Sequence, residues 1–189
     1  MRRAALIVFA CAVTALATHA QQKPSLADLK TTPEATGYKS TSNYDDVVKF
    51  MKTVDEASPL IFYTTYGTTT EGRAMPMAVV GSGLKDASAA AVKASGKLRV
   101  HIQANVHAGE VEGKESTLVL LREFAMGQHK DWLQSMVFLV TPDYNADGNE
   151  KFALTNRQRQ NGPINGMGTR ANAQNLNCLL YTSPSPRDS

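Results

Sequence analysis

The sequence predicts an α/β domain in which a mixed β-sheet is flanked by helices. Residues 98–106 alternate apolar and polar side chains, which is the pattern of a strand with one buried face. Residues 136–140 form a nearly continuous apolar run, which is typical of a strand buried on both faces. Residues 43–58 and 113–126 instead repeat apolar side chains at helical spacing. Strand and helix patterns therefore alternate along the chain, as in an α/β fold.

Residues typical of helix ends support the first of the two long helices, in addition to its periodicity. Asn43 can cap the first one, and Pro59 directly follows Ser58 and ends it. The second helix follows the 98–106 strand, and we expect Lys114 and Arg122 to point outward from it. The apolar positions that should face the sheet are Val47, Phe50, Met51 and Val54 in the first helix and Leu118, Leu121, Phe124 and Ala125 in the second.

Shorter elements complete the predicted order. Aromatic and β-branched residues indicate a strand at 60–66, and a turn segment separates it from a second strand at 75–80. The Ala-rich stretch 86–97 is predicted as a short helix or a loop. Asn145 to Gly148 has the composition of a turn. The polar stretch from 149 to 177 is predicted as a loop at the carboxyl ends of strands, where open α/β sheets bind ligands.

The two ends of the chain are expected to lie outside the domain, which we place at residues 43–177. A basic start, a short apolar run and a small residue at Ala20 predict a signal peptide over residues 1–20. Residues 21–42 are predicted as a leader loop. Residues 178–189 have no periodicity, and one codon choice for the first eleven reproduces a transposase adapter used in sequencing libraries. We therefore expect this tail to be a translated adapter.

Cysteine and charge limit the classes of partner. Cys11 lies in the predicted signal peptide and Cys178 in the tail, so no disulfide framework is expected. Without the charged residues of those two segments, the formal charge of +3 falls to +1. This balance gives no signature of nucleic-acid binding. After signal cleavage no stable membrane anchor is expected, so the predicted location is secreted or periplasmic.

His107 and Glu110 are the candidate metal ligands. They lie three residues apart, in the turn between the 98–106 strand and the following helix. Zinc is commonly held by such a pair, a distant third ligand and a water molecule. The spacing alone is weak, because a surface histidine and a helix-start glutamate would look the same. His101, His129, Glu112 and Glu115 are not expected to join the pair as a third ligand or a general base.

Four segments in order resemble the N-terminal half of a zinc carboxypeptidase of the carboxypeptidase A superfamily. The pair His107 and Glu110, preceded by Asn105, resembles the zinc motif of that family. Tyr66-Gly67 through Glu71-Gly72-Arg73 resembles its Glu-Gly-Arg hairpin. Asn145 to Gly148 resembles its Asn-Pro-Asp-Gly turn, with Ala146 in place of proline. Asn156 to Arg159, followed by residues 168–174, resembles the approach to its substrate-binding Asn-Arg motif. The fold implied is a truncated zinc-carboxypeptidase-like domain.

The resemblance implies zinc as the cofactor and the C-terminus of a peptide or protein as the substrate. His107 and Glu110 match two of the three zinc ligands. Arg159 or Arg157 matches the arginine that binds the substrate and stabilises the oxyanion, and spacing leaves this choice open. The sequence departs from the family after Asn177, so the Asn-Arg pair, the third ligand and the catalytic glutamate have no counterpart in it. The general base is therefore expected beyond this segment, and this chain is expected to be an inactive fragment.

Two alternatives remain open at this point. The first is a related zinc-dependent deacylase or amidohydrolase, which shares the histidine–glutamate pair and removes acyl groups from small amides. The second is a secreted binding fragment without catalytic activity. The Gly-Pro and Asn-rich loop after Asn156 favours the peptidase.

Overall fold

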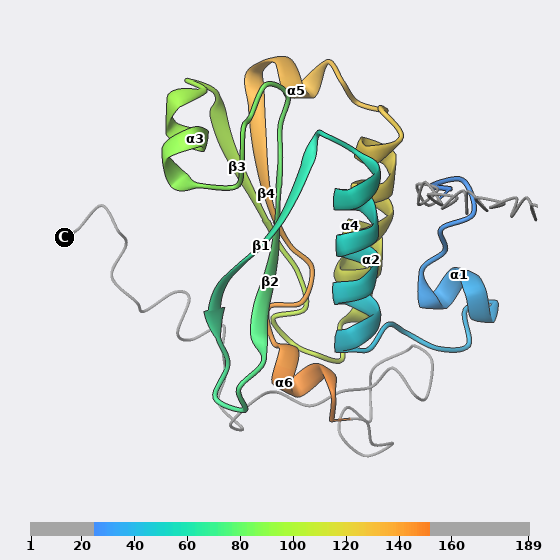
Figure 1. Cartoon of the computed structure of the whole chain (residues 1–189). Coiled ribbons are helices and arrows are strands. Elements are labelled where there is room, and N and C mark those ends of the chain that lie inside the picture. Colours follow the sequence, from blue (N-terminus) through green and yellow to red (C-terminus); the bar gives the residue numbers. More distant parts are fainter. Residues whose placement is uncertain (1–24, 152–189) are drawn as a thin grey trace, which may run out of the picture.

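A four-stranded mixed sheet between two layers of helices forms the centre of the protein (Figure 1). The computed structural model describes residues 25–151. The strands are β1 (Ile61–Thr68), β2 (Ala74–Val80), β3 (Leu98–Gln103) and β4 (Met136–Thr141), and their order in the sheet is β1-β2-β4-β3. The first two pairs are antiparallel, whereas β3 and β4 run parallel. The predicted α/β fold with a mixed sheet is confirmed.

Two long helices, α2 (Tyr44–Ala57) and α4 (Val111–Ala125), cover one face of the sheet (Figure 1). Asn43 caps α2 as predicted, because its side chain accepts the backbone N–H of Asp46 and the Asp46 side chain accepts that of Asn43. The apolar side chains predicted for the two helices form the main core with residues of β1, β2 and β4. Burial of this shared face, rather than helix propensity alone, stabilises both helices.

A smaller apolar cluster lies on the opposite face of the sheet. The short helix α3 (Ala89–Ala94) packs there through Val92, against Val79 and Val137 of the two inner strands. Because β4 contributes to both clusters, it is buried on both faces, as its apolar sequence predicted. The Ala-rich stretch therefore contains a helix, one of the two structures expected for it.

The predicted leader loop contains a short helix, α1 (Thr32–Thr36), so that prediction is wrong for these five residues. Thr31 and Glu34 form a capping box at its start. Glu34 also binds Arg122 of α4 through two contacts of 2.7 Å, which lower the pKa of the Glu34 carboxyl to about 2. This ion pair ties the leader to the helical layer, and Arg122 is therefore paired rather than simply directed outward.

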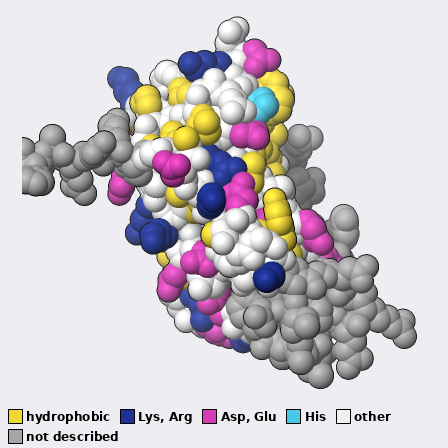
Figure 2. Space-filling view, turned by 90° about the vertical axis from the view of Figure 1, so that its right-hand side faces the viewer, with side chains coloured by type: hydrophobic (Ala, Val, Ile, Leu, Met, Phe, Trp, Pro, Cys, Tyr) yellow, Lys and Arg dark blue, Asp and Glu magenta, His cyan; other side chains and the backbone are white. Residues whose placement is uncertain are grey.

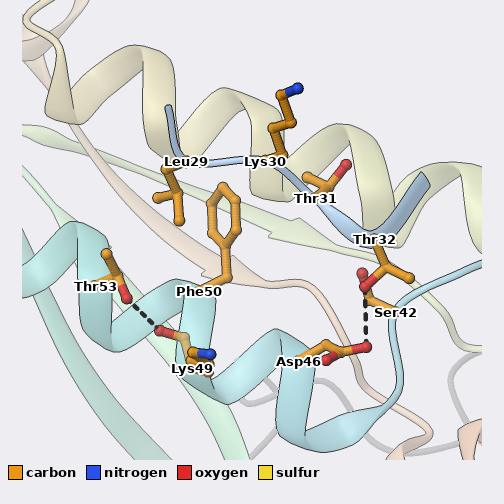
Figure 3. Close-up of a pocket in the computed structure, with 9 residues that line it drawn as sticks. All are labelled: Leu29, Lys30, Thr31, Thr32, Ser42, Asp46, Lys49, Phe50 and Thr53. Atoms are coloured by element: carbon orange, nitrogen blue, oxygen red, sulfur yellow. Dashed lines mark hydrogen bonds between the residues drawn. The ribbon is translucent and has the colours of Figure 1, made fainter. Parts of the chain in front are cut away.

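A cavity of about 180 Å³ lies between the leader and α2 (Figure 3). Leu29 and Phe50 supply apolar lining, and Thr32 donates to the Asp46 carboxylate at 2.9 Å beside them. Figure 2 shows the face of the molecule that lies on the right in Figure 1. On this face, acidic and basic side chains of the described residues are mixed and do not form separate patches. Neither candidate metal ligand lines this cavity.

Strand ends and short turns differ most from the sequence prediction. The strand predicted at 98–106 ends at Gln103, because residues 104–106 bend away to form the loop before α4. The predicted turn at 145–148 is a one-turn helix, α6 (Ala146–Asn149), whose start is capped by the Asn145 side chain. Another short helix, α5 (Trp132–Ser135), precedes β4. Within residues 25–151, the structure contains no helix with the length and apolarity needed to cross a membrane.

Replacing Phe124 by alanine should lower the free energy of unfolding by about 3–5 kcal/mol, because the ring is fully buried and its loss leaves a cavity. The ring packs against Phe138 and Trp132, with centroids 5.1 and 6.2 Å away. Met126→Ala, at an exposed site beside the same helix end, is the control and should change stability by less than about 0.5 kcal/mol. Urea denaturation measures both, and equal effects would contradict the core assignment.

Candidate metal centre

The parallel pair β3 and β4 places two loops at one edge of the sheet. Gln103 pairs with Thr141 at the ends of the two strands, and the Ala104 N–H donates to the Thr141 carbonyl at 2.9 Å. Beyond that point the backbone N–H groups of Tyr144 and Asn145 donate to the carbonyls of residues 104 and 105 at 3.1 and 3.2 Å. The start of the loop that carries the candidate ligands is therefore bound to the end of β4 and the loop after it.

His107 and Glu110 lie at the two ends of one tight turn. The Glu110 N–H donates to the His107 carbonyl at 2.8 Å, which closes the turn. The side chains converge on the same side, with Nδ1 of His107 2.8 Å from Oε1 of Glu110. Glu110 precedes α4 but its side chain makes no capping bond, so helix capping does not explain the position of this carboxylate.

The two candidate ligands differ in exposure. His107 is 8% exposed, whereas the Glu110 side chain is 49% exposed. The start of α4 packs closely on the loop after β3, since a Cβ added at Gly113 would lie 3.1 Å from the Ala104 side chain. Nε2 of His107 is buried and has no hydrogen-bond partner among the described residues. The turn therefore presents one fixed imidazole and one carboxylate that solvent can reach.

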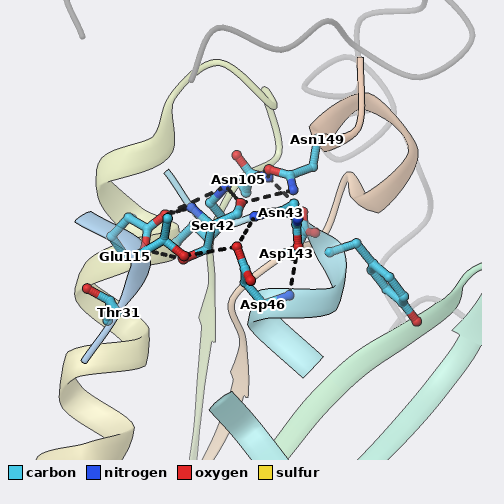
Figure 4. Close-up of polar contacts among 12 residues, drawn as sticks. Thr31, Ser42, Asn43, Asp46, Asn105, Glu115, Asp143 and Asn149 are labelled. Carbon is cyan, nitrogen blue, oxygen red and sulfur yellow. Dashed lines mark hydrogen bonds and ion pairs between the residues drawn. The ribbon is translucent and has the colours of Figure 1, made fainter. Parts of the chain in front are cut away.

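A buried polar cluster, which we define as Asn105, Lys114, Asp143 and Asn149, flanks the turn, because Asn105 precedes His107 by two residues and Lys114 follows Glu110 by four. Nδ2 of Asn105 donates to Asp143 at 2.7 Å and to Asn149 at 3.1 Å. Nζ of Lys114 donates to Oδ1 of Asn149 at 2.6 Å and to the Ser42 carbonyl. Figure 4 shows Asn105, Asp143 and Asn149 converging beside Ser42. The cluster connects the leader, α4 and both strand-end loops.

Lys114 corrects the sequence prediction, which placed it outward. It is fully buried, and burial lowers the pKa of its ammonium group while nearby carboxylates, Glu115 foremost, oppose that shift. The signal was present in the sequence, because Lys114 precedes Leu118 by four residues and Leu121 by seven, on the core-facing side of α4. Glu115 is not a free helix-start carboxylate either, since it accepts from the N–H and hydroxyl of Ser42.

Asp143 is a site residue that the sequence analysis did not single out. It is completely buried, and burial raises the pKa of its carboxyl to about 6, although Lys114 and the bond from Asn105 lower it in part. Its Oδ2 atom has no hydrogen-bond partner among the described residues. The only sequence signal was its position, two residues past the end of a buried strand.

Asp147 of α6 fixes the tip of the β1–β2 hairpin to the same edge. Its buried carboxylate accepts from the Thr69 hydroxyl at 2.6 Å, from Arg73 at 2.8 Å and from the Glu71 N–H at 3.1 Å. Burial raises the pKa of Asp147, but these hydrogen bonds outweigh it and leave the pKa below its ordinary value. Two of the four segments that carried the family resemblance are therefore in direct contact.

The other two histidines within residues 25–151 have partners of their own. Nε2 of His101 lies 3.2 Å from the Thr141 hydroxyl, and His129 contacts Glu123 at 3.0 Å and stacks on Trp132. Among residues 25–151, no group of three or more His, Cys, Asp or Glu side chains is arranged to hold a metal ion. The described part of the chain thus brings together the candidate pair, His107 and Glu110, without a third such side chain beside it. Arg157 and Arg159, the predicted substrate-binding residues, lie outside it.

This fold and site define a class of protein. The family model of the zinc carboxypeptidases matches residues 47–178, so the chain belongs to the zinc carboxypeptidase family. This confirms the resemblance inferred from the four sequence segments.

Individual relatives agree with the family. Carboxypeptidase 2 of Trichophyton rubrum is 35% identical over 104 residues, which are 52% of this chain and 18% of that protein. The metallo-carboxypeptidase of Burkholderia cenocepacia has a similar fold, with a TM-score of 0.52 and 21% identity over 78% of this chain and 35% of its own. Carboxypeptidase A of Helicoverpa armigera gives a TM-score of 0.51 and 16% identity over 73% of this chain and 31% of its own. The chain therefore spans about a third or less of these relatives.

Asp143→Asn should change how stability depends on pH. A carboxyl whose folded pKa of about 6 exceeds its ordinary 3.8 favours the folded state below pH 4 and loses that contribution as pH rises through 6. The variant should therefore gain about 3 kcal/mol relative to the wild type between pH 4 and pH 7. Denaturant unfolding across this range measures it, with the exposed Asp28→Asn as the control for loss of a charge. A difference between variant and wild type that does not vary with pH would contradict the raised pKa.

Proposed function

We propose that the protein is a zinc-dependent carboxypeptidase that removes C-terminal residues from peptides, with His107 and Glu110 as two of its zinc ligands. The observation that carries this proposal is the convergence of the two side chains, 2.8 Å apart, in a turn at the carboxyl end of β3. Membership of the zinc carboxypeptidase family supports it.

The two side chains fit a zinc ion in chemistry and nearly in spacing. A neutral imidazole nitrogen, as in His107, and a carboxylate oxygen, as in Glu110, are both ordinary zinc ligands. Their facing atoms lie 2.8 Å apart, so one zinc ion could contact both after the pair opens slightly. The exposed Glu110 carboxylate can make this small movement, while the buried His107 ring stays in place.

The chemistry of peptide hydrolysis assigns the remaining roles. A bound zinc ion polarises a carbonyl and lowers the pKa of a coordinated water to about 7. Arg159 or Arg157 would place a guanidinium where negative charge develops on the substrate carbonyl. Among the described residues, the proposed site has two ligands and no third. We therefore expect the 189-residue chain alone to bind zinc weakly and to be inactive. The proposed activity therefore belongs to the full-length protein, which we expect to be secreted or periplasmic.

In the full-length protein, His107→Ala and Glu110→Ala should each abolish zinc retention and the hydrolysis of an N-blocked dipeptide, because each removes one metal ligand. His101→Ala is the matched control, because His101 lies in β3, the strand before the turn, and this variant should keep both metal and activity. Metal analysis after dialysis and steady-state kinetics measure this. Full zinc and full rate in Glu110→Ala would show that the pair is not the metal site.

The same assay separates a carboxypeptidase from a deacylase, because only the former needs a free terminal carboxylate. The corresponding dipeptide amide should be hydrolysed far more slowly. Equal rates on acid and amide would favour the deacylase.

Arg159→Ala should retain zinc and lower kcat about a hundredfold or more, as loss of one oxyanion donor does. The arginine is expected to meet charge that appears only in the transition state, so the ground-state metal content should not change. Arg157→Ala is the comparison, measured by the same kinetics and metal analysis. If only the Arg157 variant loses activity, the zinc assignment stands and Arg157 takes the role proposed for Arg159.

A further inference from the structure

Asn105 has a backbone conformation that few residues adopt. It lies two residues before His107, and its φ of 57° is in the left-handed region, where asparagine is among the few side chains tolerated besides glycine. This conformation turns the chain out of the β3 direction and into the tight turn of His107 and Glu110. The position therefore selects for a small set of residues by backbone alone.

The Asn105 side chain adds a second constraint, which glycine could not supply. It is 4% exposed, and its amide donates to Asp143 at 2.7 Å and to Asn149 at 3.1 Å. The Asn105 carbonyl accepts the Asn145 N–H at 3.2 Å, so backbone and side chain both connect it to the segment after β4. The His107 side of the turn is thereby anchored to residues 143–149.

The Glu110 side of the turn is anchored to the same cluster. Lys114 lies four residues after Glu110, at the start of α4, and its buried ammonium donates to the same Asn149 oxygen that accepts from Asn105. Removing the Asn105 amide would take the donor from Oδ1 of the buried Asp143 carboxylate, and removing Lys114 would take one of the two donors from the Asn149 oxygen; loss of such bonds is costly inside a protein. One buried cluster therefore contacts the chain on both sides of the two candidate ligands. Figure 4 shows three of its members, Asn105, Asp143 and Asn149.

We propose that Asn105 and Lys114, joined through the Asn149 oxygen to which both donate, are positioning residues that set the separation and orientation of His107 and Glu110 for metal binding. The inference rests on the proposed function, and it adds that the buried cluster positions the two zinc ligands. Without this frame, the imidazole and the carboxylate would be free to change their relative placement. Groups that orient metal ligands in this way typically affect metal affinity 10- to 100-fold when they are removed.

The test uses Asn105→Gly in the full-length protein, because glycine keeps the left-handed backbone and removes only the side-chain contacts. We expect zinc affinity, measured by competition with a chelator, to fall 10- to 100-fold. The visible absorption spectrum of the cobalt-substituted protein should also change, because it reports ligand geometry. Lys114→Met, which keeps the length of the side chain without its donor, should act in the same direction.

Glu34→Gln is the control, because it weakens the ion pair with Arg122 at a distance from the turn. It should lower stability while leaving zinc affinity and the cobalt spectrum unchanged. If Asn105→Gly and Lys114→Met lower stability but keep wild-type affinity and spectrum, the cluster is structural only and the inference is wrong. If either variant fails to unfold cooperatively, the other decides the result.

A swapped pair gives a more specific test. Asn105→Asp alone should place a carboxylate against Asp143 and weaken zinc binding more than Asn105→Gly. Adding Asp143→Asn restores one amide donor and one carboxylate acceptor across the contact, so part of the lost affinity should return. No recovery in the double variant would contradict a positioning role for this contact. A wild-type protein that binds no zinc would instead overturn the proposed function, and the inference with it.

Discussion

The parallel pairing of β3 and β4 is the constraint on which the rest of the site depends. Parallel neighbours end at the same edge, so the chain leaving β3 and the chain leaving β4 must share that edge. In this protein they do more than share it, because backbone bonds from residues 104, 144 and 145 continue the contact beyond the strands. The loop that carries His107 and Glu110 is therefore supported by the loop after β4 and does not project alone into solvent.

Polar groups at this edge are buried at a free-energy cost that their hydrogen bonds to one another offset in part. Lys114 and Asp143 are both fully buried, and their pKa values shift in the directions that burial imposes on a cation and an acid. Asn105 and Asn149 connect them through charge-assisted hydrogen bonds, which are stronger than bonds between neutral groups. Such a cluster favours one arrangement of the surrounding loops, because most alternatives leave a charge without a partner. Rigid placement of this kind suits a site where two ligands must meet a metal at fixed distances.

Sequence periodicity predicted the structure best where a helix buries one face over several turns or a strand is buried along most of its length. The limits of α2, the apolar faces of α2 and α4, and the double burial of β4 were all predicted from periodicity and caps. The end of β3 was not, because residues 104–106 continue the alternation of the strand although the chain has already turned. Lys114 differs from the prediction because lysine is usually exposed, whereas its position lies in register with the buried Leu118 and Leu121.

By itself, the sequence determined the fold class, the two long helices and the spacing that marks His107 and Glu110, since each of these depends on residues close together in the chain. Only the tertiary structure showed that Asn105, Asp143 and Asn149 meet beside Lys114, and that Asp147 binds the β1–β2 hairpin. Those contacts join residues 35 to 78 positions apart. Periodicity carries no information about such contacts, because the strand order and the parallel β3–β4 register decide which loops become neighbours.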